Sequence, residues 1–555
     1  MQRIKFLIVA IILLIPSVSW LMQAGFFPMH DDLQPMRQLE LEKCIKDGQL
    51  PCRWVNDMGY GYGYPLFNFY PPLPYFAGQI FRVFGLTFID TVKMVGILGF
   101  AFSALGMYLL GKEFWGRKGG LISSIIFTYA PYHSVDYYVR AAVNEFWAMG
   151  FFSFVFWTTY KLIKTGEKKW IPLVSLSIVG IMLSHNPTLM IFAPFYLLWI
   201  LICWFKERSV KSFWNLAISG IWSFGFAAYF TLPVVFEQRF AHVETLVIGY
   251  FNYLAHFLDI KQMFFNINWG YGSSVYGPDD TMSFAIGYLQ WILPLVLILV
   301  IPFVKKLRDH WMIIVFCVFS FVFSVLMMHW KATPIWQFIK PLEFLQFPWR
   351  LLTLTVFFAS FLSGSIVSVS KKIVPVILLL TLMLNANYFR PREWWPDYGD
   401  DDRFFGRQWQ LMTTSGIFDY LPIYAPKPPA DPPGGDLSIL KGIGTFEKVE
   451  KKSNSQIYKV EVSSPDAVIE LQTFYFPGWK IYLDGTEKTI DPKQDPVLGR
   501  IRVNIPFGSH LIEAKFKDTP IRTVGNMVST ISWIALFAII INIYFKIRSS
   551  YEDKA

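Results

Sequence analysis

Apolar runs long enough to cross a lipid bilayer recur along the first 390 positions of the chain and appear once more near its end. A run of roughly 17–25 apolar residues crosses the hydrocarbon core as a helix. Hydrocarbon cannot form hydrogen bonds, so the backbone polar groups must find their partners within the helix. We therefore predict about twelve membrane-spanning helices. They cover residues 5–22, 89–111, 119–134, 146–163, 170–185, 188–205, 214–234, 284–304, 311–329, 351–368, 373–390 and 524–545.

Lysine and arginine gather at every second loop between these spans and at both ends of the chain. Cytoplasmic loops carry an excess of these residues, so a single orientation accounts for every cluster and places both termini in the cytoplasm. The basic clusters are Arg3/Lys5, Lys112/Arg117/Lys118, Lys161/Lys164/Lys168/Lys169, Lys206/Arg208/Lys211, Lys305/Lys306/Arg308, Lys371/Lys372 and Lys546/Arg548.

The same clusters explain the formal net charge of +10, so the charge does not indicate a nucleic-acid partner. With 54% apolar and only 16% charged residues, the chain has the lipid bilayer as its natural surroundings. The first span has an alternative interpretation as a cleaved signal peptide, because Arg3 and Lys5 precede the apolar run and Ser17 and Ser19 stand at a cleavage-like spacing.

The first external loop, residues 23–88, is the longest connection in the N-terminal half. Prolines at 71, 72 and 74 interrupt residues 65–85, which favours a helix lying on the membrane surface over a further span. Glycines 59, 61 and 63 alternate with tyrosines and predict a flexible aromatic loop. Cys44 and Cys52 both fall here, and an oxidising exterior permits either a disulfide or two free thiols.

Residues 391–522 lose the long apolar runs and alternate apolar with polar positions. Such alternation predicts strands with one buried face, and Asp484-Gly485 and Phe507-Gly508 have the composition of hairpin turns. Prolines and glycines between 426 and 435 indicate an irregular linker. The alternating positions are Val460/Val462, Ile469/Leu471, Ile481/Leu483, Ile501/Val503/Ile505 and Ile512/Ala514/Phe516.

These observations predict an α-helical polytopic membrane protein with an extracytoplasmic C-terminal β-sandwich domain. The expected division is a multi-span membrane domain at 1–390, a linker and β-sandwich at 391–522, and a final transmembrane helix with a cytoplasmic tail at 523–555. A third external loop is expected at 235–283.

The first cluster of candidate functional residues is His30-Asp31-Asp32, just outside the first span. Adjacent carboxylates can bind a divalent cation, or one of them can act as general base toward a hydroxyl. The alternative is structural, because aspartate is also favoured where a helix begins.

The second cluster, Tyr138, Arg140 and Glu145, lies at the external mouth of the third and fourth spans. An arginine there can bind a phosphate with two hydrogen bonds, and Glu145 can share a metal ion or orient an acceptor. An ion pair between Arg140 and Glu145 that caps two helices explains the residues equally well.

Arg350 follows Trp349 at the external start of the tenth predicted span. Trp349 is expected to be an ordinary interfacial anchor, while Arg350 either extends toward the headgroups or meets a lipid-linked phosphate. His185 ends the fifth span on the same side, where histidines are more often structural than catalytic. No Walker lysine motif, zinc helix or nucleophile elbow occurs in the sequence.

Several short stretches resemble the GT-C-type membrane glycosyltransferases, and more closely the bacterial multi-span proteins called 6-pyruvoyl-tetrahydropterin synthase-related membrane proteins and the YfhO-like proteins. The resemblance covers most of the chain, although its catalytic part is short. It rests on His30-Asp31-Asp32, Gly48–Trp54, Gly61–Pro65, Phe69–Leu73, Phe347–Arg350, Phe476–Lys480 and Asp484-Gly485.

The resemblance implies a GT-C-like fold and a role for each candidate residue. Asp32, or else Asp31, corresponds to the catalytic acid of the first loop, and Glu145 fills the second acidic position. Arg140 and Arg350, with His30, His185 and Tyr138 nearby, bind the donor. A divalent cation, if one is used, is held by Asp31, Asp32 and Glu145.

The implied reaction moves a sugar from a polyprenyl-phosphate donor to an extracytoplasmic glycan, lipid or protein, with inversion at the anomeric carbon. The expected location is the plasma membrane of a bacterium. Two other classes of function stay open: a lipid or glycan transporter, which needs ionisable residues deep within spans, and a non-catalytic envelope scaffold whose β-domain binds glycans or proteins.

Overall fold

The computed structural model describes residues 2–207, 209–266, 268–277, 280–416 and 419–552. Side chains at 2–8 and 546–552 lie outside the description, so the basic groups expected near both termini are not placed, and Arg208 is not described. The chain forms two compact units. Unit 1 comprises residues 1–34, 80–223 and 247–399, and unit 2 comprises residues 35–79, 224–246 and 400–555.

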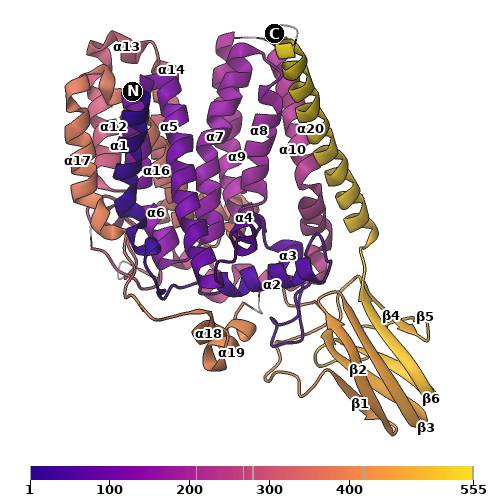
Figure 1. Cartoon of the computed structure of the whole chain (residues 1–555). Helices are drawn as coiled ribbons and strands as arrows, with labels where there is room; N and C mark the ends of the chain where they lie inside the picture. Colours follow the sequence, from indigo (N-terminus) through magenta and orange to yellow (C-terminus); the bar gives the residue numbers. More distant parts are fainter. Residues whose placement is uncertain (1, 208, 267, 278–279, 417–418, 553–555) are drawn as a thin grey trace. The chain divides into compact units, whose positions relative to one another are not determined.

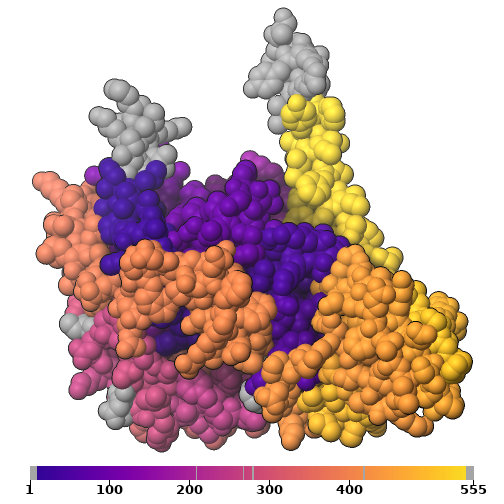
Figure 2. Space-filling view, turned by 60° about the horizontal axis from the view of Figure 1, so that its bottom comes forward, coloured from indigo at the N-terminus to yellow at the C-terminus, as the bar shows by residue number. Residues whose placement is uncertain are grey.

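Unit 1 is a bundle of helices, and helical segments occupy each span predicted within it (Figure 1). Figures 1 and 2 both place α1 beside α17, so the first and last helices of the unit are neighbours. Its principal helices are α1 (Gln2–Val18), α5 (Phe88–Thr128), α6 (Pro131–Ser134), α7 (Val143–Thr165), α8 (Trp170–Met182), α9 (Asn186–Glu207), α11 (Ile260–Phe264), α12 (Tyr288–Val300), α13 (Lys305–Arg308), α14 (Trp311–Met328), α15 (Thr333–Phe338), α16 (Leu352–Ser363) and α17 (Val374–Asn385).

Helix α5 contains two of the predicted spans, joined by a sharp reversal at Gly116, whose φ of 74° is in the left-handed region. The two halves pack against each other. Ser124 Oγ in the second half donates a hydrogen bond of 2.7 Å to the Ala104 carbonyl in the first. A Cβ added at Gly120 would lie 2.7 Å from the Tyr108 carbonyl oxygen. Glycine at these positions therefore allows two spans to cross the apolar layer as a close pair.

The centre of unit 1 is α16, in which every residue is buried. It packs against α5, α12 and α14, while α5 and α7 form the other large helix pair. Glycines permit this close packing: a Cβ at Gly119 of α5 would lie 2.7 Å from the carbonyl oxygen of Gly364, which follows α16. The bundle is thus built around a fully buried helix, whose only polar side chains are the hydroxyls of threonine and serine.

Across the described residues, seven helices are long and apolar enough to cross a membrane, and three shorter apolar helices accompany them. Their outward faces carry exposed leucine, isoleucine, valine and phenylalanine, which suits contact with lipid tails. The chain is therefore a membrane protein.

Unit 2 joins the first external loop, the end of α10 and the C-terminal part of the chain. Its C-terminal strands form one antiparallel sheet, which appears as a continuous orange-to-yellow body in Figure 2. Its elements are α2 (Gln34–Lys46), α3 (Leu66–Phe69), α4 (Leu73–Val83, which extends into unit 1), α10 (Val210–Glu237, which begins in unit 1), α18 (Asp400–Arg403), α19 (Gly406–Thr414), β1 (Leu437–Lys441), β2 (Gly444–Lys452), β3 (Ser455–Phe474), β4 (Trp479–Leu483), β5 (Thr486–Lys488), β6 (Arg500–Phe516) and α20 (Pro520–Glu552).

The sheet has six strands in the order β1-β3-β6-β4-β5, with β2 pairing with β3 beside β1. A sandwich of two sheets was expected, and the structure has one continuous sheet because β3 and β6 are long enough to pair through both halves. The proposed turn at Asp484-Gly485 is confirmed between β4 and β5. The one at Phe507-Gly508 is wrong: Gly508 lies inside β6 and pairs with Val462.

A shift in the pairing register between Val462 and Asp466 explains why the sequence pattern predicts two strands where the structure has the single strand β3. Before it, Val460 and Val462 point into the core, and after it Ile469 and Leu471 do so. The residues that face the core therefore have even numbers before the register shift and odd numbers after it. Since side chains alternate along a strand, a bulge of this kind shifts the apolar series while the strand continues.

The glycine-tyrosine stretch of the first loop is packed rather than flexible. Tyr62 belongs to the core of the sheet, and Trp54 meets Trp479 edge-on at a centroid distance of 5.6 Å. A Cβ at Gly63 would lie 2.7 Å from Trp54 Nε1, so close contact and not mobility explains that glycine. Cys44 and Cys52 form a disulfide, which settles the choice left open by their spacing.

A buried ionic cluster joins three distant segments of unit 2. Glu237 at the end of α10 accepts hydrogen bonds from Arg522 Nε at 2.9 Å and Asn68 Nδ2 at 2.8 Å. Arg53 reaches Asn526 Oδ1 at 2.8 Å and the Tyr229 carbonyl at 3.0 Å. Removing one partner of such a buried pair leaves an uncompensated charge, so these contacts hold the first loop, α10 and α20 together.

The close contact at Gly119 predicts a difference between two helical glycines. In Gly119→Val the new side chain meets the Gly364 carbonyl, and overpacking of this kind costs about 1–3 kcal/mol. The midpoint of thermal unfolding of the purified protein should therefore fall. Gly220→Val is the control, because nothing lies within 4 Å of a Cβ there. Equal midpoints for the two variants would contradict the packing described.

Candidate functional site

The polar side chains of the 132–145 segment are positioned by a tight turn between α6 and α7. A single π-helical turn, Val135–Val139, places Asp136 one turn before Arg140, and the two side chains form an ion pair. The turn closes when the Ala142 N–H donates to the Asp136 carbonyl at 2.7 Å. Ala141 adopts a left-handed φ of 54°, which lets the chain reverse directly into α7.

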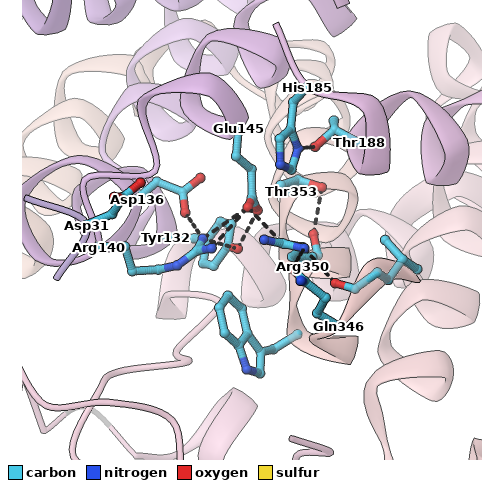
Figure 3. A network of polar contacts seen from close by, with 12 residues as sticks. Asp31, Tyr132, Asp136, Arg140, Glu145, His185, Thr188, Gln346, Arg350 and Thr353 are labelled. Carbon is cyan, nitrogen blue, oxygen red and sulfur yellow. Dashed lines mark hydrogen bonds and ion pairs between the residues drawn. The ribbon is translucent and has the colours of Figure 1, made fainter. Parts of the chain in front are cut away.

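Glu145, in the first turn of α7, is the centre of the site (Figure 3). Its Oε2 accepts hydrogen bonds from Arg140 Nη1 and Nη2, both at 3.1 Å, and from Arg350 Nε at 3.1 Å. Its Oε1 accepts one of 2.7 Å from the Tyr132 hydroxyl. One buried carboxylate thus orients two guanidinium groups, the second of which comes from a residue 205 positions further along the chain than Glu145.

Residues just before Arg350 in the sequence also hold its guanidinium group. Its Nη1 donates to the Leu345 carbonyl at 2.6 Å and to Gln346 Oε1 at 2.9 Å. The Trp349 ring lies 4.4 Å from the guanidinium carbon of Arg140 and is almost fully buried. The prediction of an ordinary interfacial anchor at Trp349 is therefore wrong, because the ring forms a cation–π contact inside the site.

The charge of this cluster depends on Asp136. Burial, and then the nearby Glu145 carboxylate, raise the pKa of Asp136 well above its usual value, with Arg140 acting in the opposite direction. Asp136 therefore takes up a proton more readily than a free aspartate does, and its protonation makes the cluster more positive. The cluster lies at the N-terminus of α7, where the helix dipole favours anions.

The first external loop is fastened to this turn through its backbone. The Asp31 N–H donates to the Arg140 carbonyl at 3.0 Å, and the His30 N–H donates to the Val139 carbonyl at 3.0 Å. Gln34 Nε2 adds hydrogen bonds to the Ala141 carbonyl at 2.7 Å and to Asp31 Oδ2 at 3.3 Å. The structure therefore brings Asp31 beside Arg140, as Figure 3 shows, with Asp32 next in the chain.

Three other predicted residues have different surroundings. His185 lies beside Glu145 and Arg350 in Figure 3, and its Nδ1 contacts Thr188 Oγ1 at 2.6 Å. His30 Nε2 contacts the Tyr271 carbonyl at 2.9 Å. Tyr138 is buried, and its hydroxyl donates to the Ser17 carbonyl at 2.8 Å. Tyr138 therefore anchors the turn against the first helix and does not line the charged cluster.

A divalent cation would need several oxygen or nitrogen ligands arranged around one point. Among the residues that the structure describes, no three histidine, cysteine, aspartate or glutamate side chains are so arranged. Glu145 is instead occupied by arginines. The set of Asp31, Asp32 and Glu145 does not fit a metal ion in this arrangement.

Asp136, Tyr132 and Gln346 are members of the cluster that sequence reasoning did not identify. Asp136 carried a usable signal, because its spacing of four residues from Arg140 puts both on one face of a helical turn. Gln346 has the same spacing of four residues from Arg350. Tyr132 has no such spacing, because it contacts Glu145 across thirteen positions.

Comparisons with known proteins give distant matches. No family model matches the chain. An uncharacterized protein of Lactococcus lactis subsp. cremoris (strain MG1363) is 26% identical over 213 residues, which make up 36% of this chain and 34% of that protein. The solved structure of the arabinofuranosyltransferase AftD from Mycobacteria aligns with 71% of this chain and 28% of its own, at a TM-score of 0.43 and 11% identity. The chain thus spans about a third or less of each of these proteins, and the matches assign no family.

The position of Glu145 predicts a large effect of its loss on stability. Glu145→Gln removes the only charge that faces both arginines across the described contacts, and breaking a buried pair of this kind costs about 3–5 kcal/mol. Glu113→Gln is the control, since Glu113 pairs with Lys161 and Lys164 in a partly exposed position and should cost roughly 1 kcal/mol or less. Thermal unfolding of both variants tests this, and equal shifts would contradict a central role for Glu145.

The raised pKa of Asp136 predicts a specific dependence on pH. The folded state holds a proton that the unfolded chain releases near its ordinary value of about 4. This carboxyl therefore stabilises the fold below that value and loses its contribution as the pH rises through the folded pKa. Asp136→Asn keeps a neutral side chain at every pH. Its unfolding midpoint relative to wild type should rise between pH 5 and pH 9, and a constant difference would contradict the shift.

Proposed function

We propose that this protein is a membrane glycosyltransferase that moves a sugar from a polyprenyl-phosphate donor to an extracytoplasmic acceptor. One observation supports this most: two largely buried arginines converge at one end of an apolar bundle, beside the backbone-anchored Asp31. A lipid-linked phosphate has an apolar tail that matches the apolar bundle and an anionic head that matches the two arginines.

The two arginines are suited to the donor's phosphate. Arg140 and Arg350 are each 8% exposed, so both still reach the surface. Within the described residues, the hydrogen bonds of Arg350 use Nε and Nη1, which leaves Nη2 for a ligand. The N-terminus of α7 adds to the attraction. In a water-poor site such donors stabilise the charge that develops on a leaving phosphate.

The proposed step is a direct displacement. The carboxylate of Asp31 or Asp32 takes the proton of the acceptor hydroxyl while that oxygen forms a bond to the anomeric carbon. The bond between the anomeric carbon and the phosphate oxygen breaks, and its electron pair stays on the phosphate. Attack from the face opposite the phosphate inverts the anomeric centre. The backbone contact between Asp31 and Arg140 favours Asp31 as the base, although the resemblance slightly favours Asp32.

Glu145 has a different role in this proposal from the one implied by resemblance. Its carboxylate is engaged by Arg140, Arg350 and Tyr132, so it acts as a positioning residue for the two guanidinium groups and not as a second acid. Its loss should then weaken donor binding more than the chemical step, whereas loss of the base should leave donor binding nearly unchanged.

The test is transfer of radiolabelled sugar from a panel of polyprenyl-phosphate donors by the purified protein in lipid nanodiscs. Loss of the base lowers kcat by about 10²–10⁴, so Asp31→Asn should show this with little change in KM. Arg140→Lys should raise the donor KM and lower kcat/KM, because lysine cannot form the paired hydrogen bonds of arginine.

Asp32→Asn and Glu167→Gln complete the series, the second as a control on an exposed side chain paired with Lys169. If Asp32→Asn alone abolishes transfer, the base is Asp32. If no donor of the panel is consumed and all variants still support the host, the transferase proposal fails and a transport or scaffold function replaces it.

A further inference from the structure

Unit 1 contains a second feature of interest at the opposite end of α7. A hollow of about 500 Å³, counting its open mouth, lies where the reversal of α5, the ends of α7 and α9 and the start of α14 meet. Glu145 and Lys164 stand near the two ends of α7 and are separated by nineteen residues, or roughly 28 Å along the helix axis. The hollow is therefore independent of the proposed transfer site.

The lining of the hollow combines apolar and aromatic side chains with charged ones. It includes Phe114, Tyr160 and Trp311 together with Lys164 and Lys206. Lys164 Nζ lies 5.2 Å from the centre of the Tyr160 ring. Aromatic residues with adjacent lysines are typical of the boundary between hydrocarbon and lipid headgroups.

Charges of both signs face the histidine of this hollow, His310. Lys206, Lys306 and Lys164 are close enough to act on it, as is Asp309 next to it in the chain. Burial and these lysines lower the pKa of His310, so the imidazole is neutral near pH 7. Glu207 also lines the hollow. A ligand that carries both a negative and a positive group matches this lining better than a simple anion.

The surface around the hollow is built for lipid. Leu201, Phe205 and Trp311 are 58%, 60% and 56% exposed, although all are large and apolar. They lie at the end of the bundle whose lysines the charge bias assigns to the cytoplasmic leaflet. An acyl chain could therefore lie along these residues while its headgroup enters the hollow.

We infer that this hollow binds one phospholipid whose headgroup carries a phosphate and an ammonium group. The phosphate meets Lys164 and Lys206, the ammonium meets Asp309 and Glu207, and the imidazole of His310 supplies a hydrogen bond. This site is separate from the proposed catalytic function and does not depend on it.

The test is the binding of short-chain phosphatidylethanolamine to the full-length protein in detergent, followed by native mass spectrometry. The Lys164→Ala/Lys206→Ala variant should bind about tenfold more weakly, as expected for the loss of hydrogen bonds to a charged group. Asp309→Asn should weaken phosphatidylethanolamine but not phosphatidylglycerol, which lacks the ammonium. Lys169→Ala is the matched control, because Lys169 lies at the same end and pairs with Glu167 at 2.5 Å.

Separate arms identify the source of the phosphate. Diacylglycerol, which has no phosphate, should bind far more weakly than the phospholipid, and millimolar inorganic phosphate should not displace the lipid. Displacement by inorganic phosphate would overturn the lipid as occupant. Equal binding of diacylglycerol, or an equal loss of binding in Lys169→Ala, would overturn a headgroup site altogether. Equal unfolding midpoints of all variants exclude misfolding as the cause.

Discussion

The inability of hydrocarbon to form hydrogen bonds is the constraint on which the helical unit depends. Backbone polar groups in such surroundings must be satisfied within the helix, and ionisable side chains gather at helix ends or pair with one another. The fully buried α16 illustrates the first consequence. The second is the cluster around Glu145, where two guanidinium groups share one carboxylate and a tyrosine hydroxyl. A charged side chain is stable in the interior of this bundle only where it has an oriented partner.

The same rule organises unit 2, although its segments are of a different kind. Glu237, Arg522 and Arg53 are buried, and their contacts connect α10, α20 and the first loop. Around them the aromatic residues of the loop complete the core of the sheet. Each unit therefore combines an apolar body with a small ionic cluster that joins segments far apart in the sequence. Such pairs contribute little net stability compared with apolar replacements, but breaking them is costly. Their role is to determine which segments meet.

The sequence predicted the spans well because hydropathy and charge bias are local signals. It also located the strands, since alternation of buried positions is local too. It misjudged Phe507-Gly508, because a glycine in a bulge and a glycine in a turn have the same composition around them. The packed glycine-tyrosine stretch was misread for a similar reason. Glycine in a sequence is compatible with either a flexible backbone or close packing. Only the position of Trp54 beside Gly63 shows that close packing applies here.

For the candidate site, the sequence by itself determined that Asp31, Arg140, Glu145 and Arg350 occupy the ends of apolar runs, on the side opposite the lysine clusters. Only the tertiary structure decided that one carboxylate holds both arginines, that Asp136 and Trp349 belong to the same cluster and that Tyr138 does not. The physical reason is the distance along the chain over which each effect acts. Burial in lipid acts on each segment separately and can be read along the chain, whereas hydrogen bonds between charged side chains depend on distances that exist only after the helices have packed.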